Sequence, residues 1–193
     1  MNITDLTFLF GFLPIIVIAY YIVPNPVREY LLVAASLVFY AMGDMKHLAL
    51  FLISVIFNIL IARTMNRCTG ATRRTLLIIA VAADIAALSF YKYNGFLPLG
   101  ISFFTFKEIS YLADVYTKKI DLSDNIMHDA FYISFFAQIQ AGPISRYAES
   151  NVQISRDRFA SGVIRFITGI CKKILLANTL LVITRETFGT PPR

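Results

Sequence analysis

Residues 98–116 read PLGISFFTFKEISYLADVY, an apolar run close to the length that crosses a bilayer, and it contains Lys107 and Glu108. A charged side chain near the bilayer centre costs about 2.5–3.5 kcal/mol even on a lenient insertion scale. On a helix, Lys107, Tyr111 and Asp114 share one face, whereas Glu108 points about 100° away. We therefore predict that Lys107 and Glu108 do not pair within the helix, and that the Lys107 face borders a polar or water-filled interior.

The composition is typical of an integral membrane protein. Of the 193 residues, 57% are hydrophobic and only 16% are charged, which lies well outside the usual composition of a soluble domain. The net charge of +6 does not indicate a nucleic-acid partner, because the basic residues lie between apolar segments and not on one polar face. They are better explained as charges that flank membrane helices. The predicted partner is therefore the lipid bilayer.

Five apolar segments approach the length of about 20 residues that a spanning helix needs. The sequence predicts an all-α, polytopic membrane helix bundle with about five to six transmembrane helices. The five segments are 6–23, 30–42, 47–62, 75–91 and 98–116. The first is interpreted as a retained helix and not as a signal peptide, because its flank is acidic and no small-residue cleavage site follows. Pro24 and Pro26 then predict a tight connection to the second segment.

The distribution of positive charge predicts the orientation of these segments. The loop RTMNRCTGATRR, residues 63–74, holds four arginines and should therefore lie in the cytoplasm. Alternation of the segments then places seven Lys and Arg residues on the cytoplasmic side and two on the outer side. The same alternation predicts that the N-terminus lies outside.

After Tyr116 the pattern changes, because a polar stretch leads to FYISFFAQIQ, residues 131–140. This apolar stretch is too short to cross a bilayer before Gly142 and Pro143 end it. We predict that it is a short re-entrant or buried segment.

The last apolar run, 159–183, is interrupted by Arg165, Lys172 and Lys173. We predict an interfacial helix over 157–173 and a membrane segment from 174, with one long spanning helix as the alternative. The chain ends soon afterwards, at Arg193, without a polar tail. We expect residues 1–193 to be the N-terminal part of one larger domain.

Several polar side chains fall inside the apolar segments, namely Asn58, Asp84, Lys107, Glu108, Tyr111 and Asp114. A functional role is the first interpretation of such residues, because their burial in a membrane is costly. The alternative is structural. Asn58 can form hydrogen bonds between helices, and Asp114 is close enough to the cytoplasmic end to be solvated. The sequence leaves both interpretations open.

No spacing in the sequence assembles a catalytic set. It contains no glycine-rich phosphate loop, nucleophile elbow or metal-ligand cluster. His47 and His128 stand at the starts of apolar segments and are interpreted as interfacial residues. Cys68 and Cys171 lack metal-ligand or redox spacing and are interpreted as unpaired thiols. From physical reasoning alone, the sequence predicts a membrane bundle with a polar core.

Two sequence blocks resemble the membrane-bound O-acyltransferases. They are PLGISFFTFKEISYLADVY at 98–116 and FYISFFAQIQAGPISRY at 131–147, separated by a polar loop. The run SLVFYAMGDMKHLALFLISVIFNILIA at 36–62 fits the same family. The resemblance is to its bacterial branch, which contains alginate O-acetyltransferase and the D-alanyl-teichoic acid transfer protein. It extends over nearly the whole chain.

The resemblance implies an enzyme of the bacterial cytoplasmic (inner) membrane that moves an acyl group, above all acetyl. The implied donor is a cytoplasmic thioester, either acetyl-CoA or an acyl-carrier protein, and no resident cofactor is expected. The implied acceptor is a hydroxyl of an extracytoplasmic polysaccharide, and an extracytoplasmic acetyltransferase partner is expected to complete the transfer. D-alanyl transfer to teichoic acid remains the alternative.

The family uses a His as general base on the acceptor hydroxyl, and that His belongs to its second half, which is expected beyond Arg193. Neither His47 nor His128 matches its position, so we predict that this chain holds no catalytic residue and is inactive alone. The family also implies residues that line or brace a funnel through the bundle. These are Ser102, Gln138, Gly142, Pro143 and Arg146. Lys107 departs from the family, in which Gln is common at this position.

Arg146 has two interpretations. Its guanidinium could meet a phosphate of the donor, or it could serve only as a positive anchor at the cytoplasmic face. Gly142 would permit close backbone approach and Pro143 would fix the turn beside it.

Two other classes of protein fit parts of the pattern. In a transporter fragment, Asp84, Lys107 and Asp114 would relay protons or substrate, but the repeated hydropathy pattern of such proteins is not found in the sequence. In a structural membrane subunit, the same residues would only join helices. The two sequence blocks favour the acyltransferase.

Overall fold

The computed structural model describes residues 5–95, 97–120, 122, 125–139, 147 and 156–189. In these residues every regular element is helical, so the predicted all-α class is confirmed. The chain divides into two units, residues 1–151 and residues 152–193.

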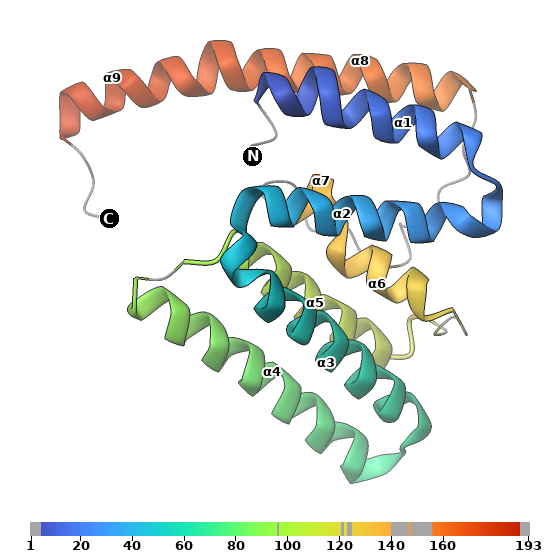
Figure 1. Ribbon diagram of the computed structural model, residues 1–193. Helices are drawn as coiled ribbons and strands as arrows, with labels where there is room; N and C mark the ends of the chain where they lie inside the picture. Colours follow the sequence, from blue (N-terminus) through green and yellow to red (C-terminus); the bar gives the residue numbers. More distant parts are fainter. Residues whose placement is uncertain are drawn as a thin grey trace. The chain divides into compact units, whose positions relative to one another are not determined.

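The first unit contains seven α-helices and three short helical turns among its described residues (Figure 1). In chain order they are η1 (Phe8–Phe12), α1 (Leu13–Ile22), η2 (Asn25–Val27), α2 (Arg28–Asp44), η3 (Met45–His47), α3 (Leu48–Arg67), α4 (Gly70–Tyr93), α5 (Ile101–Tyr116), α6 (Ile126–Ser134) and α7 (Phe136–Ile139). The second unit contains α8 (Arg156–Lys172), η5 (Lys173–Ala177) and α9 (Asn178–Phe188).

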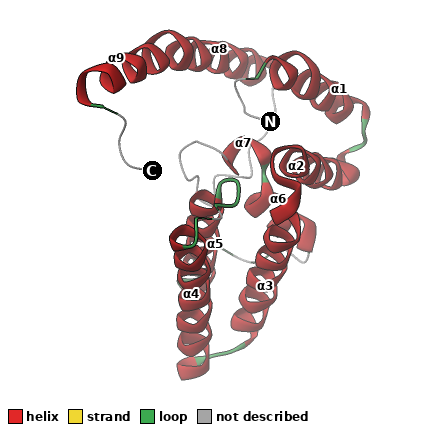
Figure 2. Ribbon diagram, turned by 60° about the vertical axis from the view of Figure 1, so that its left-hand side comes forward, coloured by secondary structure: helices red, strands yellow, loops and turns green. Residues whose placement is uncertain are grey.

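Three helical runs in the described residues are long and apolar enough to cross a membrane, which confirms the predicted polytopic bundle. They are Asn25–Arg67, Gly70–Tyr93 and Phe159–Thr184, and Phe8–Ile22 is a shorter apolar helix. The run Asn25–Arg67 changes direction at η3, so α2 and α3 are separate helices, as predicted (Figures 1 and 2). At 16 residues, α5 is shorter than a typical spanning helix. The number of crossings therefore stays a prediction.

Helices α3, α4, α5 and α6 enclose the main apolar core. Helix α4 packs against α5, and α3 packs against both; Figure 1 shows the three helices running alongside one another. Within the core, the Tyr40 ring stacks on Phe51 at a centroid distance of 4.5 Å, and Phe51 meets the edge of Phe104 at 5.2 Å. The outer faces of α3 and α4 are apolar and exposed, which suits contact with lipid tails. They present Ile53, Ile56, Leu60, Ile78, Ile79, Ile85 and Phe90.

A second apolar cluster, of Phe8, Phe12, Phe39 and Phe136, joins η1, α2 and α7. The Phe12 and Phe136 centroids are 5.4 Å apart with perpendicular rings, and the Phe8 and Phe39 centroids are 5.5 Å apart. Edge-to-face contacts of this kind add about 0.5–1.5 kcal/mol per pair beyond the area they bury. The start of the chain is thereby packed against its second and seventh helices.

The short apolar segment predicted at 131–140 is a broken helix. Helix α6 begins earlier, at Ile126, and Phe135 leaves the helical conformation with φ −56° and ψ 116° before α7 begins. The Phe136 amide donates a hydrogen bond to the Ser36 hydroxyl at 3.1 Å, so a backbone group freed by the break is satisfied by α2. Irregular backbone of this kind is tolerated in a membrane where protein buries it. The re-entrant topology itself stays a prediction.

In the second unit, α8, η5 and α9 form one continuous helix from Arg156 to Phe188. Because Phe159–Thr184 is long and apolar enough to cross a membrane, this favours one long helix over an interfacial helix followed by a membrane segment. The boundary predicted at 173 coincides with the π-helical turn Lys173–Ala177. Such turns are local widenings of an α-helix.

Candidate functional site

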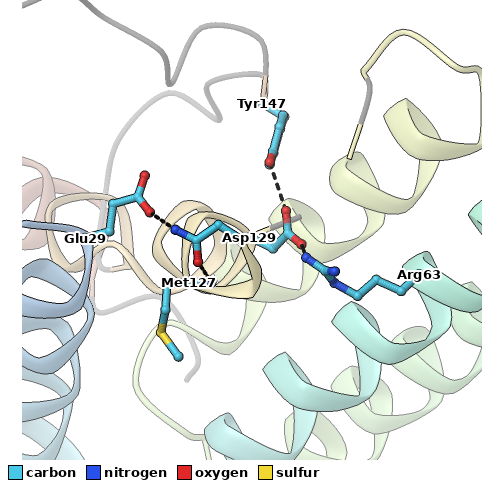
Figure 3. A network of polar contacts seen from close by, with 6 residues as sticks. Glu29, Arg63, Met127, Asp129 and Tyr147 are labelled. Carbon is cyan, nitrogen blue, oxygen red and sulfur yellow. Dashed lines mark hydrogen bonds and ion pairs between the residues drawn. The ribbon is translucent and has the colours of Figure 1, made fainter. Parts of the chain in front are cut away.

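The first polar network of the interior is centred on Asp129 in α6 (Figure 3). Its carboxylate is fully buried and lies 2.9 Å from the Arg63 guanidinium of α3. The Tyr147 hydroxyl donates a second hydrogen bond to it at 2.9 Å. Burial, and then the nearby Asp129 carboxylate, raise the pKa of Tyr147 above its ordinary value, so its hydroxyl remains a donor. A buried charge is tolerated here because both of its oxygens have partners.

The second half of this network ties α6 to the start of α2. The Glu29 carboxylate accepts a hydrogen bond from the Asn125 amide at 2.7 Å and lies 2.9 Å from His128 Nδ1. The His128 ring meets the Tyr147 ring edge-on, with centroids 5.2 Å apart. His128 is therefore paired with a carboxylate, and is not only the interfacial residue that the sequence suggested.

Asn125 has two separate roles at the start of α6. Its side-chain oxygen accepts a hydrogen bond from the Met127 amide at 3.0 Å and caps the helix, while its side-chain nitrogen donates to Glu29.

We expect Asn125→Ala to lower the free energy of unfolding by about 1–2 kcal/mol, because the cap and the Glu29 contact are both lost. Asn125→Ser keeps a capping side chain, so it should lower the free energy of unfolding by less than Asn125→Ala does. Thermal unfolding of the three proteins in detergent measures the difference, and equal losses for Ala and Ser would contradict the capping role.

Lys107 extends the network toward α5. The side chain is 3% exposed, and its ammonium nitrogen lies 4.8 Å from the centroid of the Tyr132 ring. Tyr132 contacts Tyr147, and Tyr111 contacts both rings, with centroid distances of 5.1, 5.7 and 6.1 Å. The face predicted to border a polar interior thus lies against the Tyr132 ring of α6 and the Tyr147 ring. A cation over an aromatic face gains about 0.5–2 kcal/mol, depending on desolvation.

A second polar cluster joins α3, α4 and α5. The Ser54 hydroxyl lies 2.9 Å from both carboxyl oxygens of Glu108, and the Asn58 amide donates to Asp84 at 3.1 Å. Ser54 and Asn58 are one helical turn apart, and the Asn58 amide also donates to the Ser54 carbonyl at 3.1 Å. Glu108 and Asn58 are fully buried, and Asp84 is 5% exposed. Asn58 therefore forms an interhelical bond, as its structural interpretation proposed.

The structure brings together some of the residues predicted for the site. Lys107 and Tyr111 are buried on one face of α5, and none of the ion pairs of the described residues joins Lys107 to Glu108, as predicted. Asp84 belongs to the second cluster. The remaining described residues, Asp114, Ser102 and Gln138, are only partly buried.

Other predicted positions lie outside the described residues. They are Gly142, Pro143 and Arg146. Their roles in lining or bracing the funnel therefore stay predictions. The same holds for the general base, since the His that the family uses is expected beyond Arg193.

Sequence reasoning did not identify Arg63, Asp129 and Glu29 as members of a network. The partners are far apart in the chain: Arg63 and Asp129 are 66 residues apart, and Glu29 and His128 are 99 apart. Helical spacing gives no signal at such separations. The usable signal was the placement of Asp129 and Arg63 at the ends of apolar segments, where a charge needs a partner.

The network holds ionic and hydrogen-bonding groups but, among the described residues, no assembled nucleophile and base. Asp129 and Glu29 are already occupied by Arg63, Tyr147, Asn125 and His128. In the part of the chain that the structure describes, no three His, Cys, Asp or Glu residues are grouped to hold a metal ion. What the arrangement can do is fix α6 between α2, α3 and α5.

The sequence of this chain is similar to those of several bacterial proteins named as O-acetylases or O-acetyltransferases. The chain is 32% identical to the probable alginate O-acetylase AlgI of Pseudomonas aeruginosa, in an alignment that covers 94% of this chain and 41% of that protein. It is 33% identical to the protein of the same name from Pseudomonas fluorescens, covering 94% and 40%. It is 30% identical to the peptidoglycan O-acetyltransferase of Helicobacter pylori, covering 89% and 43%.

No family model and no solved structure matches the chain. The chain spans about two fifths of the length of the curated relatives it matches. These relatives confirm the resemblance that the two sequence blocks indicated.

Proposed function

Because the chain is a relative of the bacterial alginate O-acetylases, we propose that it forms part of a membrane-bound O-acyltransferase acting on an extracytoplasmic polysaccharide. The observation that carries this proposal is similarity over 94% of the chain, which includes both sequence blocks. The helical membrane bundle with polar interior networks supports it. In this proposal residues 1–193 serve as a scaffold, and the catalytic groups belong to another part of the enzyme.

The acyl group is proposed to be acetyl, because the relatives named above are an alginate O-acetylase and a peptidoglycan O-acetyltransferase. The acceptor hydroxyl attacks the thioester carbonyl, so that a C–O bond forms, the C–S bond breaks and the thiol leaves. The hydroxyl proton passes to a general base. By analogy with the family, that base is a His beyond Arg193. The donor is a cytoplasmic acetyl-CoA or acyl-carrier thioester, and the membrane is the bacterial inner membrane with the N-terminus outside.

A chimeric enzyme tests the proposal. The matching region of the Pseudomonas aeruginosa relative is replaced by residues 1–193, and the chimera is produced in cells that lack their own enzyme. Ester-linked acid is then released from the exported polymer by alkali and identified. The unmodified relative is the positive control, and the relative without its matching region is the negative control.

Acetate released at a level above the negative control supports the proposed function. Released D-alanine would favour the alternative of D-alanyl transfer. A chimera that inserts in the membrane at the level of the unmodified relative, and yet yields no ester, would contradict the proposed function.

Arg146 supplies a prediction about donor recognition. In the active chimera, Arg146→Ala should raise the KM for the thioester donor roughly tenfold, because a charge-assisted hydrogen bond to a donor phosphate contributes on the order of 1.5–3 kcal/mol. Membrane insertion should not change. Initial rates at varied donor concentration, with Arg146→Lys as the charge-conserving control, measure the effect. A KM equal to that of the unsubstituted chimera would leave Arg146 only as a positive anchor.

Residues 1–193 alone are expected to be catalytically inactive, because the proposed general base lies outside them. The purified chain, in detergent with acetyl-CoA and an acceptor polysaccharide, should consume thioester no faster than the buffer does. Thioester consumption above this background would refute the assignment of the base to another part of the enzyme.

A further inference from the structure

The cluster of Ser54, Asn58, Asp84 and Glu108 places two carboxyl groups in the interior between α3, α4 and α5. Two carboxylates in one apolar region repel one another, and each loses its hydration there. Their negative charge can be neutralised by a bound cation or by protonation of the carboxyl groups. The contacts around the two carboxyl groups distinguish a cation from protons.

The geometry at Glu108 favours a proton. The Ser54 hydroxyl lies 2.9 Å from each of the two carboxyl oxygens. A hydroxyl has one hydrogen to donate, so it can satisfy only one oxygen of an ionised carboxylate fully. A protonated carboxyl completes the pair, because its own O–H donates to the serine oxygen while the serine O–H donates to the other carboxyl oxygen. Glu108 is fully buried, so bulk water does not reach its carboxyl group.

The geometry at Asp84 indicates the same. One carboxyl oxygen accepts the Asn58 amide, whereas the other, Oδ2, is buried and has no hydrogen-bond partner in the structure. The Asn58 side-chain oxygen is likewise buried and without a donor. Buried polar atoms are almost always satisfied, so two unsatisfied acceptors beside one carboxyl indicate a missing hydrogen. A proton on Asp84 supplies one donor to this cluster.

The buried and half-buried basic groups of α3, α4 and α5 are engaged elsewhere in the described chain, whereas Arg67, Arg74 and Lys92 are exposed. Arg63 of α3 pairs with Asp129, Arg73 of α4 donates to the Val115 carbonyl at 2.6 Å, and Lys107 of α5 lies over the Tyr132 ring. The remaining ionisable side chains of α2, η3 and α3 to α6 are Arg28, Glu29, Tyr30, Tyr40, Asp44, Lys46, His47, Arg67, Arg74, Tyr91, Lys92, Tyr93, Tyr111, Asp114, Tyr116, His128, Asp129 and Tyr132. Within the described ranges, none of these forms an ion pair with Asp84 or Glu108.

We propose that Asp84 and Glu108 form a proton-binding site in the membrane interior, with both carboxyls protonated at neutral pH and held by Ser54 and Asn58. Each proton lets its carboxyl act as a hydrogen-bond donor within the cluster. The site does not depend on the proposed acyltransferase function. Its ligand is the proton, and ionisation of either carboxyl would place an uncompensated charge between α3, α4 and α5.

Infrared spectroscopy of the whole chain in lipid tests this proposal directly. A protonated carboxyl has a C=O stretching band that an ionised carboxylate lacks, and exposed Asp and Glu side chains ionise near pH 4. At neutral pH we expect a residual band that shifts in D₂O. Asp84→Asn and Glu108→Gln should each remove part of it, and the double variant should abolish it. Asp114→Asn, at a half-buried position on the helix of Glu108, should leave it unchanged.

Isotope labelling keeps the test valid if a variant fails to fold. In the unsubstituted chain, carboxyl-labelled glutamate should shift the Glu108 part of the band, and labelled aspartate should shift the Asp84 part. A chain with no band at neutral pH, or with a band that only one of the two labels shifts, would overturn the paired site. Loss of the band on addition of Na⁺ at constant pH would also overturn it, since the occupant would then be a metal cation.

Discussion

Arg63→Met is expected to lower the free energy of unfolding by about 3 kcal/mol. The substitution keeps an unbranched side chain, although a shorter one, and leaves the Asp129 carboxylate, which is 0% exposed, without its cation. Removing one partner of a buried ion pair typically costs 3–5 kcal/mol, because the remaining charge is neither hydrated nor paired. The lower end applies here, because Tyr147 still donates to Asp129. Thermal or denaturant unfolding in detergent, followed by circular dichroism, measures the change.

Arg67→Met is the matched control for this prediction. Arg67 lies one turn farther along α3 and is exposed, so its loss should change the free energy of unfolding by less than about 1 kcal/mol. The double variant Arg63→Met, Asp129→Leu should regain part of the lost stability, because no buried charge remains. Equal losses for Arg63→Met and Arg67→Met would show that the ion pair does not stabilise the fold.

Gly100→Ala should also destabilise the chain by about 3 kcal/mol. Gly100 precedes α5 with φ +66°, a left-handed conformation that costs other residues about 1–2 kcal/mol. A Cβ atom there would overlap the Ile139 carbonyl oxygen of α7, which is backbone and cannot rotate away. Overpacking of this kind adds about 1–3 kcal/mol. The midpoint of thermal unfolding should fall accordingly.

Gly95→Ala separates the two causes of this loss. Gly95 has φ +75°, but a Cβ atom there would meet nothing within 4 Å. Its substitution should therefore cost only the conformational part, about 1–2 kcal/mol. The excess loss in Gly100→Ala then measures the contact of the α5 start with α7. If the two variants unfold at the same temperature, that close contact is absent from the protein in its membrane or detergent environment.

The helices and the membrane character could be predicted from the sequence, because apolar length and charge placement are local signals. The segments 47–62 and 75–91 correspond to α3 and α4, and Pro24 and Pro26 mark the break before α2. The continuous helix Arg156–Phe188 was harder to predict, because Arg165, Lys172 and Lys173 suggested an interface. Long basic side chains can extend from a helix toward the headgroups, so they interrupt the hydropathy signal without ending the helix.

The site could be predicted only in part. Helical spacing predicted that Lys107 and Tyr111 share one face of α5. The partner of Glu108 could not be predicted in this way, because Ser54 belongs to another helix, α3. Pairs such as Arg63 and Asp129 depend on how the helices pack, and one sequence contains no direct measure of that packing. The family resemblance implies roles for Gly142, Pro143 and Arg146. It carries no signal for α2, where Glu29 binds the start of α6.

The cluster of Phe8, Phe12, Phe39 and Phe136 has a consequence for biosynthesis. Phe136 is made about 130 residues after Phe8, and at about 5–20 residues per second this takes roughly 6–26 seconds. Until then, the first apolar helix, Phe8–Ile22, has only its neighbour in the chain to pack against. The first helix to leave the ribosome is therefore among the last to reach its final place, and it stays exposed to membrane chaperones and proteases throughout that interval.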